Sequence, residues 1–257
     1  MEIMQIHLFK NNKFINPFIY LIFSGCFDAV TEYSVSAVFP NLILIYFFLS
    51  MFISMIAAAL VGEEQKNKVL NYEILYGHSR EKIYMSRFIT INMWTIISMV
   101  VTVAPSFIYL LVAKEWGVSG DFKYAVLRLL LLLLVLIKFS SFMVSSFFWF
   151  KNPQIASGIA SGIDSIFTMA YMFISMLENG LTDWFDKYVV PVISLVGAFN
   201  ICQIGNTKYG YVDGKDIPVY DFSFTTEYAL KMVIISVVLI GIYMILGLKL
   251  YKRQDVS

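Results

Sequence analysis

Long runs of apolar residues, each close to the length of a membrane-crossing helix, dominate the hydrophobic pattern of this chain. A helix must contain about 20 mostly apolar residues to cross the hydrocarbon core of a bilayer. Six runs come near that length, and they comprise residues 14–34, 38–62, 88–113, 124–150, 155–177 and 228–250. The runs are continuous rather than alternating, which indicates helices and not the strands of a barrel. The pattern therefore predicts an all-α membrane protein with six transmembrane helices, in which residues 1–257 form one transmembrane domain.

A seventh apolar run, residues 188–204, needs a separate interpretation. It contains Pro191, Asn200 and Gln203, which interrupt its apolar character. The run is either a further span or a segment that re-enters the membrane or lies at its outer interface. The distribution of basic residues distinguishes these alternatives, because short cytoplasmic segments carry an excess of Lys and Arg.

Six spans place most of the basic residues on one side of the membrane. That side holds eleven of the 19 Lys and Arg residues: Lys10, Lys13, Lys66, Lys68, Arg80, Lys82, Arg87, Lys151, Lys249, Lys252 and Arg253. A seventh span would move the last three of these to the outside. We therefore predict that residues 188–204 are re-entrant or interfacial and that both termini are cytoplasmic.

The segments between the runs differ in character. Residues 1–13 mix apolar and basic side chains, which predicts an amphipathic helix on the inner membrane surface; a frayed terminus is the equally weighted alternative. Residues 63–87 form the longest predicted cytoplasmic segment. Residues 178–227 form the predicted outer loop, in which three Lys residues stand against seven acidic residues.

Composition agrees with the hydropathy pattern and excludes several functions. The chain is 59% hydrophobic and 14% charged, whereas a soluble domain averages roughly 45–50% and about 25%. Its net charge of +1 gives no reason to expect a nucleic-acid partner. The two His residues, His7 and His78, are far apart, and the two Cys residues have no metal or redox spacing. We therefore expect neither an enzyme nor a metal site.

The predicted cytoplasmic segment contains signals for two helices. Gly77 is a natural helix stop, because glycine tolerates the left-handed conformation of a C-terminal cap. Ser79 can cap the N-terminus of the next helix, and Glu81 is favourable in its first turn. One short helix should therefore end near Tyr76, and another should begin near Ser79 and continue into the third span.

This segment resembles the first cytoplasmic loop of ABC-2 type permeases of ABC exporters. The matching residues are Glu63 at the end of the second run, the stretch 66–76, Gly77-His78-Ser79-Arg80, Lys82-Ile83-Tyr84 and Arg87. The resemblance extends to the whole chain through its amphipathic start, six spans and partly apolar outer loop. It implies the fold of a type V ABC exporter, located in a bacterial cell membrane.

In that family the short helix is the coupling helix, which seats in a groove of the ATPase subunit. The resemblance therefore implies that ATPase coupling involves Glu63, Lys66, Lys68, Leu70, Tyr72, Glu73, Tyr76, Gly77, Ser79 and Arg80. The chain has no G-x-x-x-x-G-K-[ST] phosphate loop. ATP and Mg would bind to separate ATPase subunits, and this chain would pair with a second, identical or similar permease chain.

The cargo follows only from the resemblance. Small Gram-positive permeases of this kind often export amphipathic peptides such as bacteriocins or toxins, or remove them to give immunity. We expect hydrophobic or amphipathic peptide export or antimicrobial peptide resistance, with lipids or hydrophobic drugs as the alternative cargo. A different class remains open, namely an ion-coupled secondary transporter or channel that uses Lys138 and Asp164.

Charged residues interrupt several of the predicted spans. Asp28, Lys138 and Asp164 lie inside them, where a charge costs on the order of 2.5–3.5 kcal/mol near the helix centre. Lys138 is twelve residues before Phe150, or about 18 Å from the inner end of its span. This depth fits a Lys138–Asp164 pair between spans four and five. A buried pair that fixes helix packing is the favoured interpretation, and a polar site in the transport path is the alternative.

The fifth run is rich in small residues. Gly158 and Gly162 have the GxxxG spacing, which lets helix backbones approach closely. This pair can pack within the subunit or across a dimer interface, and packing within the subunit is the favoured interpretation.

Overall fold

The computed structural model describes residues 38–67, 69–113, 121–150, 153–175, 184–185, 188–202, 205–212, 215–221 and 226–253. The predicted amphipathic start, the first predicted span with Asp28, and Lys68 lie outside these residues.

Long helices occupy the second to sixth apolar runs. They are α3 (Val38–Ala57), which continues as the π-helix η2 (Ala58–Gly62), α6 (Arg80–Ala113), α7 (Asp121–Trp149), α8 (Pro153–Ser175) and α11 (Thr226–Arg253). Among the described residues, three helical stretches are long and apolar enough to cross a membrane: Arg80–Ala104, Val126–Trp149 and Thr226–Arg253. The predominantly helical fold is thus confirmed and is compatible with a membrane protein, while the number of six spans stays a prediction.

The α7 helix lies at the centre of the bundle. It contacts α3, α6, α8, α10 and α11, and most of its residues from Leu131 to Phe148 are buried. The other long helices expose large apolar side chains on their outer faces, including Met55 on α3, Val101 on α6 and Phe173 on α8. An interior helix ringed by helices with apolar outer faces is the arrangement expected where lipid surrounds the protein.

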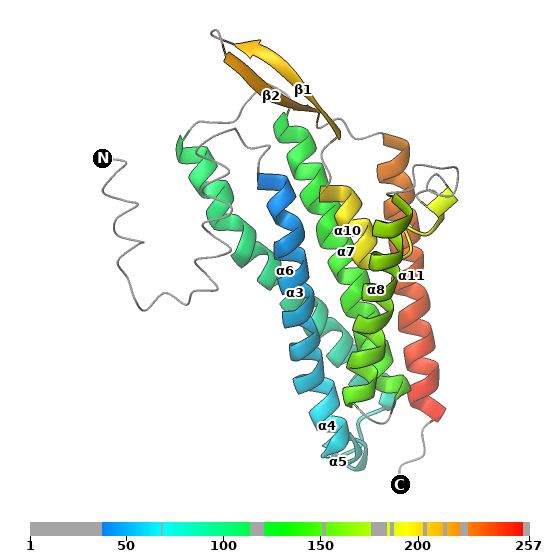
Figure 1. Cartoon of the computed structure of the whole chain (residues 1–257). Coiled ribbons are helices and arrows are strands. Elements are labelled where there is room, and N and C mark those ends of the chain that lie inside the picture. The colour runs from blue at the N-terminus through cyan, green and yellow to red at the C-terminus, as the bar shows by residue number, and fades with distance from the viewer. Residues whose placement is uncertain are drawn as a thin grey trace.

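The two ends of the bundle carry different structures. The short helices α4 (Glu63–Lys66) and α5 (Val69–Leu75) lie at one end, where α11 also ends (Figure 1). A two-stranded hairpin lies at the opposite end, where α11 begins. Residues 63–87 and the end of α11 therefore share one end of the bundle, as the six-span topology requires.

The apolar run 188–204 contains α10 (Ser194–Cys202), a helix of nine residues that packs against α3, α7 and α8. Nine residues of helix extend about 14 Å, less than half of the hydrocarbon core of about 30 Å. This helix is too short to be a seventh span. Its buried residues include Val196, Ala198 and Ile201.

The hairpin corrects the prediction that the fold is entirely helical. Strand β1 (Gly205–Val212) pairs antiparallel with β2 (Lys215–Asp221), with Val212 opposite Lys215. The sequence carries a signal for it, because the turn-forming dipeptide Asp213-Gly214 separates two short runs that contain tyrosine and β-branched residues. An acidic outer loop was predicted here, and no strand was predicted within it.

Candidate functional site

The turn between α5 and α6 is a glycine-capped helix end. Gly77 has a positive φ of 89°, a conformation that side chains with a Cβ rarely adopt. The amide of Gly77 donates to the carbonyl of Ile74 at 3.0 Å, and that of His78 donates to Glu73 at 3.1 Å. These two bonds form a Schellman motif, which satisfies the last carbonyls of α5. The predicted helix stop at Gly77 is confirmed.

Ser79 caps the N-terminus of α6. Its hydroxyl accepts a hydrogen bond from the amide of Lys82 at 3.4 Å, and its carbonyl accepts one from Ile83 at 3.1 Å. The predicted cap is therefore confirmed. Only His78 and Ser79 lie between the turn at Gly77 and the start of α6. This short connection restricts the orientation of α5 relative to α6.

Arg87 connects α4 and α5 to α6. Its Nε donates to Glu64 Oε2 at 2.7 Å, and one terminal nitrogen donates to Glu73 Oε1 at 2.5 Å. Less than a third of each of the three side chains is exposed. Charge-assisted bonds of this kind are stronger than neutral ones, particularly away from bulk water. Arg87 therefore holds both short helices against the base of α6.

Replacing Arg87 by Met is expected to lower the free energy of unfolding by about 2 kcal/mol, because two partly buried carboxylates then face each other without a cation. Thermal unfolding of the detergent-solubilised protein measures this effect. Arg253→Met is the matched control, because Arg253 is exposed in the last turn of α11. Adding Glu64→Gln to Arg87→Met should restore part of the loss. Equal stability of the Arg87→Met and Arg253→Met proteins would contradict the role assigned to Arg87.

The outer face of α5 is apolar and exposed. The exposed fractions are 60% for Tyr72, 78% for Leu75 and 85% for Tyr76, and Val69 on the same short helix is also exposed. Tyr72 and Tyr76 are four residues apart and so lie on one face of the helix. We call Val69, Tyr72, Leu75 and Tyr76 the docking face. Among the other residues predicted for coupling, Glu63 is exposed. The side chains of Lys66 and Leu70 are not among those that the structure describes.

The first turn of α6 is clamped to the last turn of α11. Arg80 donates to the main-chain carbonyls of Tyr251 at 3.2 Å and Lys252 at 2.8 Å. Lys252 also forms an ion pair with Glu81. Basic groups at the C-terminal end of a helix also interact favourably with its dipole. The clamp thus connects the predicted coupling segment to the last helix.

A buried aromatic group extends this connection into the bundle. Tyr84 contacts Phe148 with ring centroids 5.0 Å apart, and Phe148 contacts Tyr251 at 4.7 Å. The Tyr84 hydroxyl lies 3.3 Å from the Ser145 hydroxyl, which donates to the carbonyl of Tyr243 at 2.8 Å. At this end α6, α7 and α11 are therefore joined by both tilted aromatic contacts and hydrogen bonds.

Lys138 is completely buried near the middle of the bundle. Its ammonium donates a hydrogen bond to the carbonyl of Pro191 at 2.8 Å. Asp164 lies on α8, which packs against α7. The structure therefore places the two predicted charges on neighbouring helices, and the hydrogen-bond acceptor of Lys138 belongs to the segment that precedes α10. The sequence did not predict this acceptor, because a main-chain carbonyl has no side-chain signal.

Arg128 is a second buried cation on α7 that the sequence analysis missed. Only 2% of it is exposed, and it donates to the carbonyl of Ile201 at 2.7 Å. The sequence offered one signal for this contact, namely the position of Arg128 near the outer end of a predicted span. Basic residues at such positions often extend to water instead of binding inside the protein. Arg128 and Lys138 both bind main-chain oxygens of residues 188–202.

The two glycines of the GxxxG spacing do not pack closely within the described part of the protomer. A Cβ added at Gly158 or Gly162 would meet no atom within 4 Å. The close approach in the described residues occurs instead at Gly247 on α11, where a Cβ would collide with the Tyr84 hydroxyl and lie 3.0 Å from Ser145 Oγ. Packing of Gly158 and Gly162 across a dimer interface stays a prediction.

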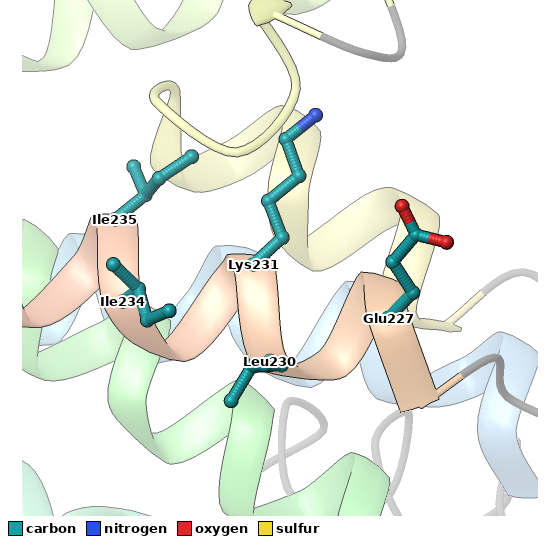
Figure 2. A pocket seen from close by; sticks show the side chains of 5 residues that line it. All are labelled: Glu227, Leu230, Lys231, Ile234 and Ile235. Carbon is teal, nitrogen blue, oxygen red and sulfur yellow. The ribbon is translucent and has the colours of Figure 1, made fainter.

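A shallow pocket lies at the start of α11. Its volume is about 290 Å³, and its lining residues are Glu227, Leu230, Lys231, Ile234 and Ile235 (Figure 2). The Lys231 ammonium lies 5.7 Å from the centroid of the Tyr188 ring, and Trp184 contacts the same ring at 5.8 Å. Tyr, Trp and Lys side chains together are typical of the level where a membrane meets water. All the lining residues come from one helix, so the pocket does not enclose a ligand.

Within the described residues, no group of three or more His, Cys, Asp or Glu side chains is placed to hold a metal ion. Comparison with known proteins finds no family model that matches the chain and no curated protein that matches it. The function is therefore argued from the sites themselves.

Proposed function

We propose that this chain is the permease subunit of an ATP-driven exporter in a bacterial cell membrane. It would have six spans, both termini in the cytoplasm, and a coupling helix, α5, that binds a separate ATPase subunit. The observation that carries the proposal is the docking face, a cluster of exposed apolar side chains on a short helix at the polar end of the bundle. No catalytic role is assigned to the chain itself.

The surroundings of α5 explain why exposed apolar residues there favour a protein partner. Charged side chains lie on the neighbouring helix ends, with Glu81 and Lys82 in the first turn of α6 and Lys252 in the last turn of α11. Large apolar side chains in such a polar setting are the usual signature of an interaction site. Tyrosines are enriched among the residues that dominate binding energy, and Tyr72 and Tyr76 lie on one face.

The contacts behind the docking face supply a route for mechanical coupling. Glu73 lies on α5 and is held by Arg87 of α6, and Arg80 of α6 is held by the last turn of α11. A partner that moves α5 would therefore move the ends of α6 and α11 together. A continuous set of polar contacts is one physical route by which movement at one site can reach another.

The proposed partners are inferred from two features of the chain, the missing phosphate loop and the glycine pair of α8. It has no phosphate loop, so ATP and Mg would be bound by the ATPase subunits. Two ATPase subunits would serve two permease chains, either identical or similar. Gly158 and Gly162, which face no described neighbour, are available for contact between the two permeases.

Residues 188–202 are proposed to be a re-entrant segment on the outer side. Val190 and Val196 are fully buried, and Pro191 reaches the level of Lys138 in the middle of α7. The chain then turns back along α7, because Ile201 is held by Arg128 near the start of that helix, whereas Pro191 is held by Lys138 near its middle. The aromatic residues Trp184 and Tyr188 would mark the outer membrane interface.

The proposed cargo is hydrophobic or amphipathic, with peptides for export or self-immunity as the first choice. Lipids or hydrophobic drugs are the alternative. Large apolar side chains are exposed on the outer faces of α3, α6, α8 and α11, which suits a cargo that partitions into the membrane. An ion-coupled transporter using Lys138 and Asp164 is the competing class.

Reconstitution with a candidate ATPase tests the proposal. The chain is co-expressed with a phosphate-loop ATPase encoded beside it, and both are co-purified and placed in liposomes. We expect a stable complex and ATP-dependent movement of a cationic amphipathic peptide, with no movement when the phosphate-loop lysine of the ATPase is replaced. Transport driven by an ion gradient in liposomes without any ATPase would overturn the proposal and favour the ion-coupled class.

A further inference from the structure

A π-helical turn interrupts the second apolar run where α3 leads into α4. In η2 the amide of Glu63 donates a hydrogen bond to the carbonyl of Ala58, five residues earlier. An α-helical bond reaches back only four residues, so this turn holds one more residue than an α-helical turn. The flanking residues Ala57 and Glu63 keep α-helical dihedral angles, with φ of −63° and −70° and ψ of −39° at both. The additional residue is therefore confined to a single turn.

The burial pattern on the two sides of η2 is displaced by the same single residue. The residues buried on α3 recur every three or four positions: Tyr46, Leu49, Ile53 and Ala57. Each α-helical residue turns the chain by about 100°, so an uninterrupted helix would place Gly62 about 160° away from Tyr46. Gly62 is nevertheless buried, as is Val61. One extra residue turns both positions back by about 100°, toward the buried face of α3.

The two sides of η2 are held by different parts of the bundle. On one side, α3 packs against α7 and α10, and η2 itself packs against α7 and α8. On the other side, α4 and α5 are attached to the base of α6, because Arg87 binds both Glu64 and Glu73. We call α4 and α5 the docking unit. Movement of the docking unit relative to α3 must be accommodated by the turn that joins them.

We propose that η2 is a hinge between α3 and the docking unit, and that one inserted residue creates it. Helices bend where a π-helical turn interrupts the regular hydrogen bonds, and such turns are frequent at functional sites. The inference deepens the proposed function, and it rests on that function only in taking the ATPase as the partner that moves the docking unit. The hinge itself is a property of this chain.

Removing the inserted residue separates a hinge from a rigid turn that only maintains the orientation of α4. Ala59 is exposed within η2, so its deletion removes no buried side chain. The deletion should leave a continuous α-helix in which Val61, Gly62 and Glu64 keep their present directions. Both explanations therefore expect this protein to fold. Only a hinge expects the deletion to suppress local opening of the backbone and to impair coupling.

Two further variants are the matched controls for the deletion. Ala59→Leu changes the same exposed position but retains the inserted residue. Deletion of Met93, an exposed residue within the uninterrupted helix α6, turns the rest of that helix by about 100° with no extra residue to absorb the change. We expect the thermal unfolding midpoint of the Ala59 deletion to equal or exceed that of the parent, and that of the Met93 deletion to fall well below it.

Hydrogen exchange of the full-length protein in lipid nanodiscs measures the opening of η2 without any ATPase. Peptides that cover residues 58–63 should exchange about tenfold or more slowly after deletion of Ala59, because regular α-helical bonds replace those of the π-helical turn. The Ala59→Leu protein should exchange within about twofold of the parent. Peptides from residues 83–92 of α6 should exchange at the same rate in all three proteins.

Binding and transport with the candidate ATPase measure the consequence for coupling. The Ala59 deletion should bind the ATPase like the parent, because the docking face and both contacts of Arg87 remain. The amount of cargo moved per ATP hydrolysed should fall severalfold, whereas Ala59→Leu should preserve it.

Each outcome decides a different part of the inference. An Ala59 deletion that fails to fold overturns the inserted residue, and equal exchange of residues 58–63 in the deletion and the parent overturns the hinge. Unchanged cargo movement per ATP in a folded deletion protein overturns its role in coupling. A parent protein that binds no ATPase contradicts the proposed function instead, and the exchange rates still decide whether η2 is a hinge.

Discussion

Replacing Leu75 by Glu is expected to weaken binding of the partner ATPase by about 30-fold or more, which corresponds to about 2 kcal/mol for a central interface residue. Leu75 is 78% exposed on the docking face, and its side chain has no role in holding α5 to α6. A carboxylate there must lose its hydration when a partner covers it, and none of the four residues that define the docking face is basic. Insertion and stability of the permease should be unchanged.

The measurement is co-purification of the ATPase with tagged permease, followed by titration of purified ATPase against the permease in detergent. Lys249→Gln is the matched control, because Lys249 is exposed at the same end of the bundle but lies on α11. Tyr76→Ala should weaken binding less than Leu75→Glu, since it removes contact area without adding a charge. Normal ATPase binding by a correctly inserted Leu75→Glu protein would exclude α5 as the docking helix.

Gly247→Ala is expected to destabilise the protein by about 2 kcal/mol, the effect of overpacking a closely fitted interior. A Cβ at this position would collide with the Tyr84 hydroxyl and crowd Ser145 Oγ, which lies 3.0 Å away. Because Tyr84, Ser145 and Gly247 come from α6, α7 and α11, relief of the collision requires these helices to separate. The aromatic contacts that join Tyr84, Phe148 and Tyr251 would weaken as a result.

A matched glycine on the same helix provides the control. A Cβ at Gly241 would meet nothing within 4 Å, so Gly241→Ala should leave stability unchanged or raise it by up to about 1 kcal/mol through helix propensity. Adding Tyr84→Phe to Gly247→Ala removes the atom that collides and should recover most of the loss. Thermal unfolding midpoints in detergent compare the four proteins. A fall of the same size for both glycine variants would show that the collision is unimportant.

Several features of the fold were predictable because they depend on short stretches of sequence. The helix stop at Gly77 and the cap at Ser79 follow from local backbone chemistry, and both occur as expected. The choice against a seventh span came from the positions of basic residues, and the nine-residue length of α10 agrees with it. The hairpin was not predicted, although the dipeptide Asp213-Gly214 is a local signal for its turn.

The candidate sites were less predictable, because they depend on how helices are rotated against one another. The sequence singled out Lys138 and Asp164 as charges that must meet a partner inside the bundle. It did not indicate that Lys138 would bind the carbonyl of Pro191, or that Arg128 would bind that of Ile201. Main-chain carbonyls become acceptors only where a helix ends or a turn interrupts it, and the position of that end in space is a tertiary property.

The sequence by itself therefore determined a predominantly helical architecture, the approximate limits of the long helices and the exposed connector at α5. These depend on the length of apolar runs and on capping residues, which act locally. Only the tertiary structure decided that α7 lies at the centre, that Arg87 binds Glu64 and Glu73, and that Gly247 rather than Gly158 marks a close approach. Nearly uniform apolar helices have many possible rotations and neighbours, and the few polar contacts and small residues that select among them act between distant parts of the chain.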